Sequence, residues 1–363
     1  MSASQRAKAL RRVTLLAATT ALVLAGGSAR AASAPVSGTP GVVTVGSGQA
    51  LPSVSPDGAT AYVVTTDSDG NLVVRAVDTR SGQVTGTAPL GAAQGSPQSA
   101  LSPDGSRLYV VNGLQLSVVA TGGPTVLATV PLPDQPRPTG WSQGLVSGLV
   151  VGPDGSEVYL VQQGPSAWRQ GGQARVLAFG TAQRQFGPTV GLPALNTGAP
   201  ALHPNGRDLY IGGGAGLYHV SAAGGTLTFV RTVPGTATNG DNGLAFTRDG
   251  GRLFATGPNS GGTLDLIDPA TDTLLRSIRT VPVRSDVPPR LSADGSRFYL
   301  LQQDSSGTTA VISVDTATAT VDTADSLAPQ ESALDGLAVG PDGHTLYVGG
   351  TNDTDAQLEV LGL

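Results

Sequence analysis

Short apolar runs alternate with polar turn segments along the chain from residue 41 onwards. Each unit has an apolar run, a turn of the Pro-Asp-Gly type and a β-branched or aromatic run, such as Leu108-Tyr109-Val110-Val111. Two further strand-like runs follow, in one unit residues 263–267 and 273–278. Because such runs favour strands, and Pro, Asp and Gly favour tight turns, each unit is predicted to form four antiparallel strands.

The turn motif occurs seven times, with starts that lie 44 to 51 residues apart. In every copy Asp or Asn follows the first residue by two places, Gly by three and an aromatic residue by seven. The copies begin at Ser55, Ser102, Gly152, His203, Thr247, Ser292 and Gly340. Four antiparallel strands in roughly 45 residues are typical of a β-propeller blade. The sequence therefore predicts an all-β, seven-bladed β-propeller over residues 41–363.

The two ends of this region predict how the ring closes. The last unit provides three strands, the third at residues 357–361, while an additional strand at residues 41–45 precedes the first unit. We expect this N-terminal strand to complete the last blade, because a paired edge leaves no open strand between the first and last blades.

Composition excludes several classes of site. The chain has no Cys and three His among 363 residues, so a Cys-ligated metal and a thiol nucleophile are excluded. His203, His219 and His344 fall in different parts of the repeat and are interpreted as surface or turn residues. No metal site is predicted from them.

Residues 1–31 have the pattern of a signal peptide. A basic start at Arg6, Lys8, Arg11 and Arg12 precedes an apolar run over residues 13–25 and the small-x-small sequence Ala29-Arg30-Ala31. An uncleaved anchor is the alternative, but the run is short for a membrane span. Residues 32–40 are interpreted as a linker, and secretion or cell-surface display is expected. Both the general secretory and the twin-arginine export routes remain open.

Removal of that segment makes the chain more acidic. The whole chain carries 21 basic and 26 acidic residues, and five of the basic residues lie in the segment, which leaves 16 and a net charge of −10. A polyanion would be repelled on average, so nucleic acid is disfavoured as a partner.

The stretch AVDTRSGQVTGTAPLGAAQGSPQSALSPDGSRLYVVN, residues 76–112, resembles the YVTN-type β-propeller repeat. The Ser-Pro-Asp-Gly turn and the Tyr-Val-Val-Asn ending carry the likeness, which extends over about residues 41–363. The resemblance implies a secreted, periplasmic or surface-layer propeller, within a wider WD40/YVTN-like superfamily that includes lactonases, streptogramin lyases and cofactor-bearing oxidoreductase domains.

Two tryptophans stand outside the repeat. Trp141 lies in the long connection between blades two and three, and Trp168 lies in an extended hairpin of blade three. Both loops are expected on one face, where recognition is often placed. The predicted ligand-binding residues are Arg137, Trp141, Gln143, Trp168 and Arg169. The alternative is that the two indoles pack together and pin the loop.

Three carboxylates are predicted to lie at one rim of the axial channel. Asp241, Asp286 and Asp335 each precede the turn motif by five or six residues, in blades five, six and seven. Such a group can hold Ca²⁺ or act as an acid–base pair, and the alternative is solvated rim acids. No cofactor is predicted apart from this alternative Ca²⁺ site.

We therefore expect a secreted binding or interaction module, monomeric, whose partner is an extracellular protein, a cell-wall component or a small molecule. The alternative function is a lactonase- or hydrolase-like enzyme that uses the three rim carboxylates. A quinone- or haem-bearing domain is a third alternative, which the low His count weighs against.

Overall fold

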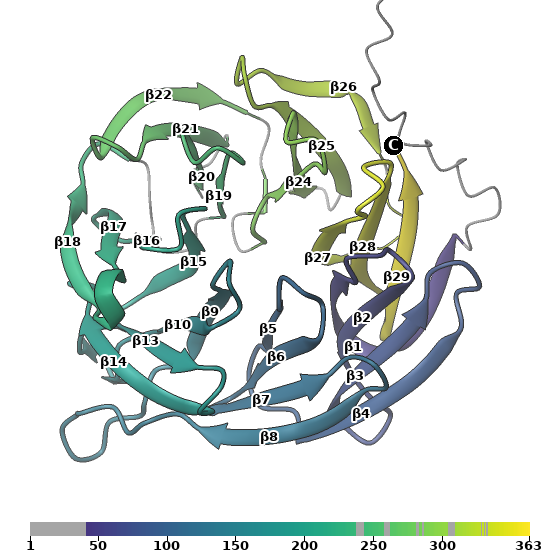
Figure 1. Cartoon of the computed structure of the whole chain (residues 1–363), viewed down its shortest axis with the longest axis horizontal. Coiled ribbons are helices and arrows are strands. Elements are labelled where there is room, and N and C mark those ends of the chain that lie inside the picture. The colour runs from purple at the N-terminus through teal and green to yellow at the C-terminus, as the bar shows by residue number, and fades with distance from the viewer. Residues whose placement is uncertain are drawn as a thin grey trace, which may run out of the picture. The chain divides into compact units, whose positions relative to one another are not determined.

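The repeats form antiparallel sheets around a common axis (Figure 1). The computed structural model describes residues 41–236, 243–257, 262–280, 283–284, 287–303, 309–327, 329, 331 and 333–363. The predicted signal peptide 1–31 and linker 32–40 lie outside the described residues, and both stay predictions. Within the described residues, no helix is long and apolar enough to cross a membrane.

The first four blades run from β1 to β18. Their strands are β1 (Val42–Val54), β2 (Thr60–Thr66), β3 (Asn71–Asp78), β4 (Val84–Ala92), β5 (Gln98–Leu101), β6 (Arg107–Asn112), β7 (Gln115–Ala120), β8 (Thr125–Pro131), β9 (Val146–Val151), β10 (Glu157–Gln162), β13 (Arg175–Gly180), β14 (Gln185–Gly191), β15 (Thr197–Leu202), β16 (Asp208–Gly213), β17 (Gly216–Ser221) and β18 (Thr228–Val233). A small separate sheet in blade three contains β11 (Ser166–Ala167) and β12 (Gln170–Gly171). A 3₁₀ turn, Ala223–Gly225, links β17 to β18.

The last three blades run from β19 to β29. Their strands are β19 (Leu244–Phe246), β20 (Leu253–Gly257), β21 (Thr263–Asp268), β22 (Thr273–Arg279), β23 (Arg290–Leu291), β24 (Arg297–Gln303), β25 (Thr309–Asp315), β26 (Val321–Leu327), β27 (Ala333–Val339), β28 (Thr345–Asn352) and β29 (Asp355–Gly362). Five blades are four-stranded sheets in chain order, and the first and seventh blades share one seven-stranded sheet.

β1 closes the ring as the sequence predicted. Its first part pairs with β29, with Val42 opposite Glu359, and its last part pairs with β2, with Val54 opposite Ala61. One strand is therefore the outer strand of blade seven and the inner strand of blade one. The seven-bladed architecture and its N-terminal closure are confirmed.

Side-chain hydrogen bonds stabilise the Pro-Asp-Gly turns. In blade two the Ser102 hydroxyl donates to Asp104 Oδ1 at 2.5 Å, and the Ser106 amide donates to the same oxygen at 3.0 Å. These bonds, that from Ser102 above all, lower the pKa of Asp104 to about 2. Gly105 takes a φ of +72°, which an L side chain rarely adopts. The carboxylates of the turns are therefore used inside their own turns.

The turns also contact one another around the ring. A Cβ added to Gly105 would lie 2.3 Å from Cδ of Pro56, which belongs to the turn of the preceding blade. The corresponding glycine in each of the remaining six turns also faces the preceding turn: Gly58 faces Pro341, Gly155 faces Pro103, Gly206 faces Pro153, Gly250 faces His203, Gly295 faces Arg248 and Gly343 faces Ala293. The seven turns thus form a closed ring of contacts, which we call the turn ring.

The hydrophobic core is divided among the interfaces between neighbouring blades. Seven clusters of buried side chains occur among the described residues, and each joins two adjacent blades. One of them joins blade seven to blade one through Tyr347, Leu358 and Val63. Because every core cluster needs two blades, closure of the ring completes the core as well as the sheet.

Candidate functional site

An axial channel passes between the inner strands of the seven blades. Its cavity has a volume of about 840 Å³, and its described lining residues come from β1, β5, β9, β15, β19, β23 and β27 and their adjoining loops. Ligand sites in proteins typically have volumes of about 300–1,000 Å³. The channel is therefore large enough for a small organic molecule.

Of the three predicted rim carboxylates, only Asp335 belongs to the described residues, and Asp241 and Asp286 lie outside them. Asp335 lines the channel at the start of β27. Its Oδ2 accepts hydrogen bonds from the Ala50 amide at 3.2 Å and from the Thr351 hydroxyl at 3.0 Å. Asp335 therefore joins blade seven to β1, and a shared catalytic role for the three acids stays a prediction.

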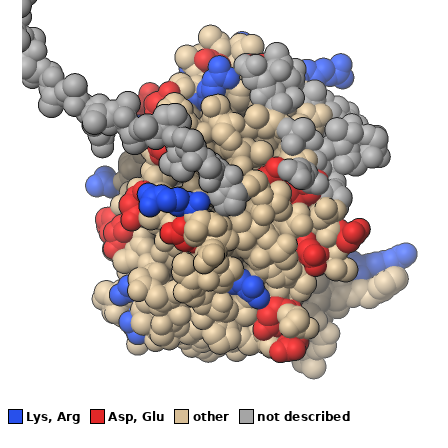
Figure 2. Space-filling model, turned by 90° about the vertical axis from the view of Figure 1, so that its right-hand side faces the viewer, with Lys and Arg blue, Asp and Glu red and all other residues tan. Residues whose placement is uncertain are grey.

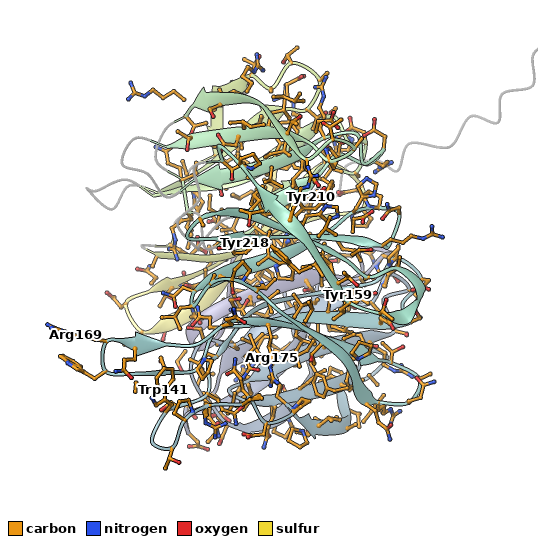
Figure 3. The ribbon with its side chains drawn as sticks, turned by 90° about the vertical axis from the view of Figure 1, so that its left-hand side faces the viewer. Trp141, Tyr159, Arg169, Arg175, Tyr210 and Tyr218 are labelled. Carbon is orange, nitrogen blue, oxygen red and sulfur yellow. The ribbon has the colours of Figure 1, made fainter. Side chains whose placement is uncertain are left out.

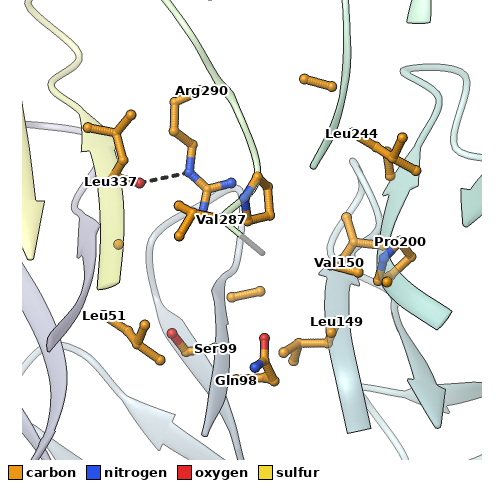
Figure 4. A pocket seen from close by; sticks show the side chains of 18 of the residues that line it. Leu51, Gln98, Ser99, Leu149, Val150, Pro200, Leu244, Val287, Arg290 and Leu337 are labelled. Atoms are coloured by element: carbon orange, nitrogen blue, oxygen red, sulfur yellow. Dashed lines mark hydrogen bonds between the residues drawn. The ribbon is translucent and has the colours of Figure 1, made fainter. Parts of the chain in front are cut away.

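Three arginines line the channel beside that one described acid. The Arg284 Nη1 donates to the Leu334 carbonyl at 2.8 Å, and Arg248 donates to the carbonyl of Ala293 in the next turn. Arg290 donates through Nε to the Leu337 carbonyl at 2.8 Å (Figure 4). The described part of the channel is therefore cationic, although the whole chain is acidic.

The two long loops of blade three lie side by side. Ser142 and Ser166 exchange backbone hydrogen bonds of 2.9 and 3.0 Å, and this bridge joins the connection before β9 to the hairpin that contains β11 and β12. Figure 3 shows Trp141 and Arg169 at the same protruding edge. We call residues 133–144 and 163–173 together the blade-three platform.

Buried polar side chains hold the platform from below. Gln135 is 2% exposed, and its amide donates to the Gln163 carbonyl at 2.9 Å while its Oε1 accepts from the Gly144 amide at 3.0 Å. Arg175 donates to the carbonyls of Pro133 and Asp134. The Gln135 contacts tie the two platform loops to each other, and the Arg175 contacts tie the platform to β13, so the platform has a defined shape.

The five predicted ligand-binding residues divide into two groups. Arg137 forms an ion pair with Asp134 at 2.6 Å and donates a hydrogen bond to the Trp141 carbonyl. The side-chain oxygen of Gln143 accepts a hydrogen bond from the backbone N–H of Gln135. These side chains therefore serve the loop itself, and Trp141 is half-buried. Trp168 is 86% exposed, with the Arg169 guanidinium 5.6 Å from its ring centroid. With Trp168 so exposed, the two indoles do not pack together.

A polar cluster between blades four and five was missed by the sequence interpretation. His219 lies between two carboxylates, with Nδ1 2.8 Å from Asp272 Oδ2 and Nε2 3.2 Å from Asp208 Oδ1. The Tyr210 ring stacks on His219, and its hydroxyl donates to Asp272 Oδ1 at 2.5 Å. The interpretation of His219 as a surface or turn residue is wrong, because its side chain is 12% exposed and links two blades.

Metal-ligating clusters are absent from the part of the chain that the structure describes: no three His, Asp or Glu side chains there are grouped to hold an ion. The alternative Ca²⁺ site at Asp241, Asp286 and Asp335 is not tested by this, since two of its residues are not described.

Comparisons with known proteins agree with this architecture. The chain is 29% identical over 165 residues to the "Seven-bladed beta-propeller protein Rv1057" of Mycobacterium tuberculosis, a match that covers 44% of this chain and 39% of that protein. The chain is a seven-bladed β-propeller. The match spans less than half of this relative, so the propeller is shown by it and an activity is not. A scan against protein-family models matches none.

Solved propeller-like structures show the same fold at low sequence identity. A chain of hydrazine synthase from Kuenenia stuttgartiensis superposes with a TM-score of 0.65 and 16% identity, over 88% of this chain and 97% of that chain. A protein of Desulfotomaculum acetoxidans, described as functionally unknown, superposes with a TM-score of 0.62 and 15% identity, over 80% and 89%. At these identities the likeness concerns the fold alone. The YVTN-type assignment stays a prediction.

Proposed function

We propose that this propeller is a secreted binding module that recognises an extracellular protein through the blade-three platform. The observation that supports the proposal is Trp168, which is 86% exposed at the tip of a hairpin that is bonded to a neighbouring loop. An indole that protrudes from a supported loop contributes nothing to the core, whereas Trp and Arg are enriched among the residues that dominate binding energy at interfaces.

The charge of the platform indicates what kind of partner surface fits it. Trp168 is accompanied by Arg169, and the Arg137 charge is already paired with Asp134. The side of the molecule opposite to the one drawn in Figure 3 has acidic and basic side chains scattered among uncharged residues and gives no comparable indication (Figure 2). A partner with an apolar groove and an acidic rim would therefore complement the tip of the hairpin.

Site-specific photo-crosslinking tests the proposal. A photoreactive amino acid at position 168 should give a discrete cross-linked product with an extracellular protein of the source cells. The matched control places it at Leu275, which is 54% exposed on the outer strand β22. Absence of a product from position 168, or the same product from both positions, would contradict a role for the platform.

A further inference from the structure

One position of the inner strands differs in kind from its six counterparts. In each blade the second strand carries the aromatic residue that follows the start of the turn motif by seven places, and one residue of the inner strand lies opposite it. In blade six this residue is Arg290, which lies opposite Tyr299. The counterparts are Ser53, Ala100, Val150, Ala201, Ala245 and Ala338. A side chain of at most three carbons is thus replaced by a long cation at one position around the axis.

Nothing in the repeat requires this arginine. A small side chain fills the position in the other six blades, and in four of them it is alanine. The Arg290 side chain is exposed where it lines the channel. Among the described residues its guanidinium has one partner, the Leu337 carbonyl, which takes the Nε proton. The Nη1 and Nη2 groups, which form the fork that carboxylates prefer, make no bond with a described residue.

The electrostatics of the channel favour an anion near Arg290. The Arg290 side chain lies inside the ring of blades, and partial desolvation there lowers the pKa of Arg290 from its usual value. The one described acid that lines the channel, Asp335, accepts bonds from Ala50 and Thr351 instead. A partly desolvated cation that has no carboxylate partner among the described residues favours a bound anion.

The channel lining also carries apolar side chains across the cavity from Arg290. Figure 4 shows Leu149, Val150, Pro200 and Leu244 on the right of the cavity, across from Arg290, with Gln98 and Ser99 at the lower edge between Leu51 and Leu149. An inorganic ion would leave that surface empty, whereas a ligand with a carboxylate and a hydrocarbon body would cover both regions. The cavity, at about 840 Å³, has room for such a molecule.

We propose that the axial channel binds a small organic carboxylate, with its carboxylate on the Nη groups of Arg290 and its apolar body against the wall formed by Leu149, Val150, Pro200 and Leu244. The site is separate from the blade-three platform and does not rest on the platform's function.

Calorimetric titration of the protein with octanoate, octanamide and acetate tests the site. Octanoate should bind, and octanamide should bind about tenfold or more weakly, because hydrogen bonds to a charged partner are stronger than neutral ones. Acetate should also bind more weakly than octanoate, since it leaves the apolar wall uncovered. Equal affinities for octanoate and octanamide, or no binding of octanoate at millimolar concentration, would overturn the proposal. Equal affinities for octanoate and acetate would overturn the role of the apolar wall.

Two variants locate the carboxylate. Arg290→Gln keeps one donor for the Leu337 carbonyl but removes the fork, so octanoate affinity should fall about tenfold or more. Arg290→Lys keeps the charge and should lose less. The matched control is Arg276→Gln, because Arg276 also donates to a backbone carbonyl, that of Thr318, but lies on the outer strand. Unchanged affinity in Arg290→Gln would overturn the assignment. Should that variant not fold, the wild-type comparison of octanoate with octanamide decides.

Trp168→Ala separates this site from the proposed function. The variant should retain octanoate binding, because Trp168 does not line the channel. If the wild-type protein does not bind octanoate while the photoreactive residue at position 168 still gives its product, the channel site is contradicted and the proposed function stands. If octanoate binds and no product forms from position 168, the proposed function is contradicted and the channel site stands.

Discussion

The turn ring and the blade-three platform are both made of loops, yet the protein uses them in opposite ways. In the turn ring each Asp is bonded to its own turn and each Gly faces the neighbouring turn. In the platform Arg137 and Gln143 are committed to the loop, while Trp168 and Arg169 are exposed beyond it. Residues that recur seven times build the propeller. Of the residues that break the repeat, Trp168 and Arg169 are exposed and available for the recognition that we propose.

The strongest test of this contrast is Gly105→Ala in the turn ring. The new Cβ would lie 2.3 Å from Pro56 and would also have to adopt a φ of +72°. Strain of this backbone type costs about 1–3 kcal/mol, and the contact adds to it, so we expect a loss of about 3 kcal/mol in the free energy of unfolding. Denaturant titration followed by circular dichroism measures it.

Two glycines separate the contributions to that loss. Gly70 has a φ of +79° and nothing within 4 Å of an added Cβ, so Gly70→Ala reports strain alone. Gly122 has neither feature, so Gly122→Ala should leave stability nearly unchanged or slightly raised. If Gly105→Ala lowered the free energy of unfolding no more than Gly70→Ala does, the contacts between neighbouring turns would contribute nothing to stability.

The dependence of stability on pH distinguishes the turn ring from a pair of buried carboxyl groups in the core. Glu331 and Glu359 are 2% and 3% exposed near the ring closure. Burial, and a hydrogen bond with Glu359, raise the pKa of Glu331 to about 8. A carboxyl whose pKa is higher in the folded state stabilises the fold below its unfolded value, near 4.5, and that stability is lost as the pH rises through about 8.

The contribution of the turn aspartates to stability depends on pH in the opposite direction. Hydrogen bonds hold the pKa of Asp104 and Asp294 at about 2, so their contribution is present above about 4 and is lost as the pH falls. Unfolding measured from pH 3 to 9 should therefore give the highest stability between pH 4 and 5, with a loss of about 4 kcal/mol by pH 8.

Glu331→Gln should remove most of the loss between pH 5 and 8 while the acid side is unchanged. Asp355→Asn, at an exposed position of β29, is the matched control and should leave the whole profile in place. A wild-type profile that is flat from pH 5 to 8 would show that the buried pair does not titrate there.

Much of the fold could be predicted because the repeat encodes it locally. A turn such as Ser102-Pro103-Asp104-Gly105 bonds within itself, so its structure follows from the residue types and their spacing. Even ring closure was predicted, since a leftover strand at one end matched a missing strand at the other.

The sites were harder to predict because they depend on contacts between distant segments. The roles of Arg137 and Gln143 depend on which backbone atoms they meet, and Asp272 reaches His219 from the next blade. Arg290 could have been noticed, because its six counterparts are small, but that comparison needs the strand register. An unusual residue is therefore informative only once its structural position is known.

The smallest expected effect on stability, and the sharpest test of the platform, belongs to Trp168→Ala. An 86% exposed side chain buries little area, so its removal should change the free energy of unfolding by less than about 0.5 kcal/mol. Trp141 is half-buried, and Trp141→Ala should cost about 1 kcal/mol. Far-ultraviolet circular dichroism suits both measurements, because each variant removes one of the two tryptophans on which fluorescence would depend. A loss above about 1 kcal/mol in Trp168→Ala would show that the indole supports the hairpin, and its exposure would then no longer argue for a partner.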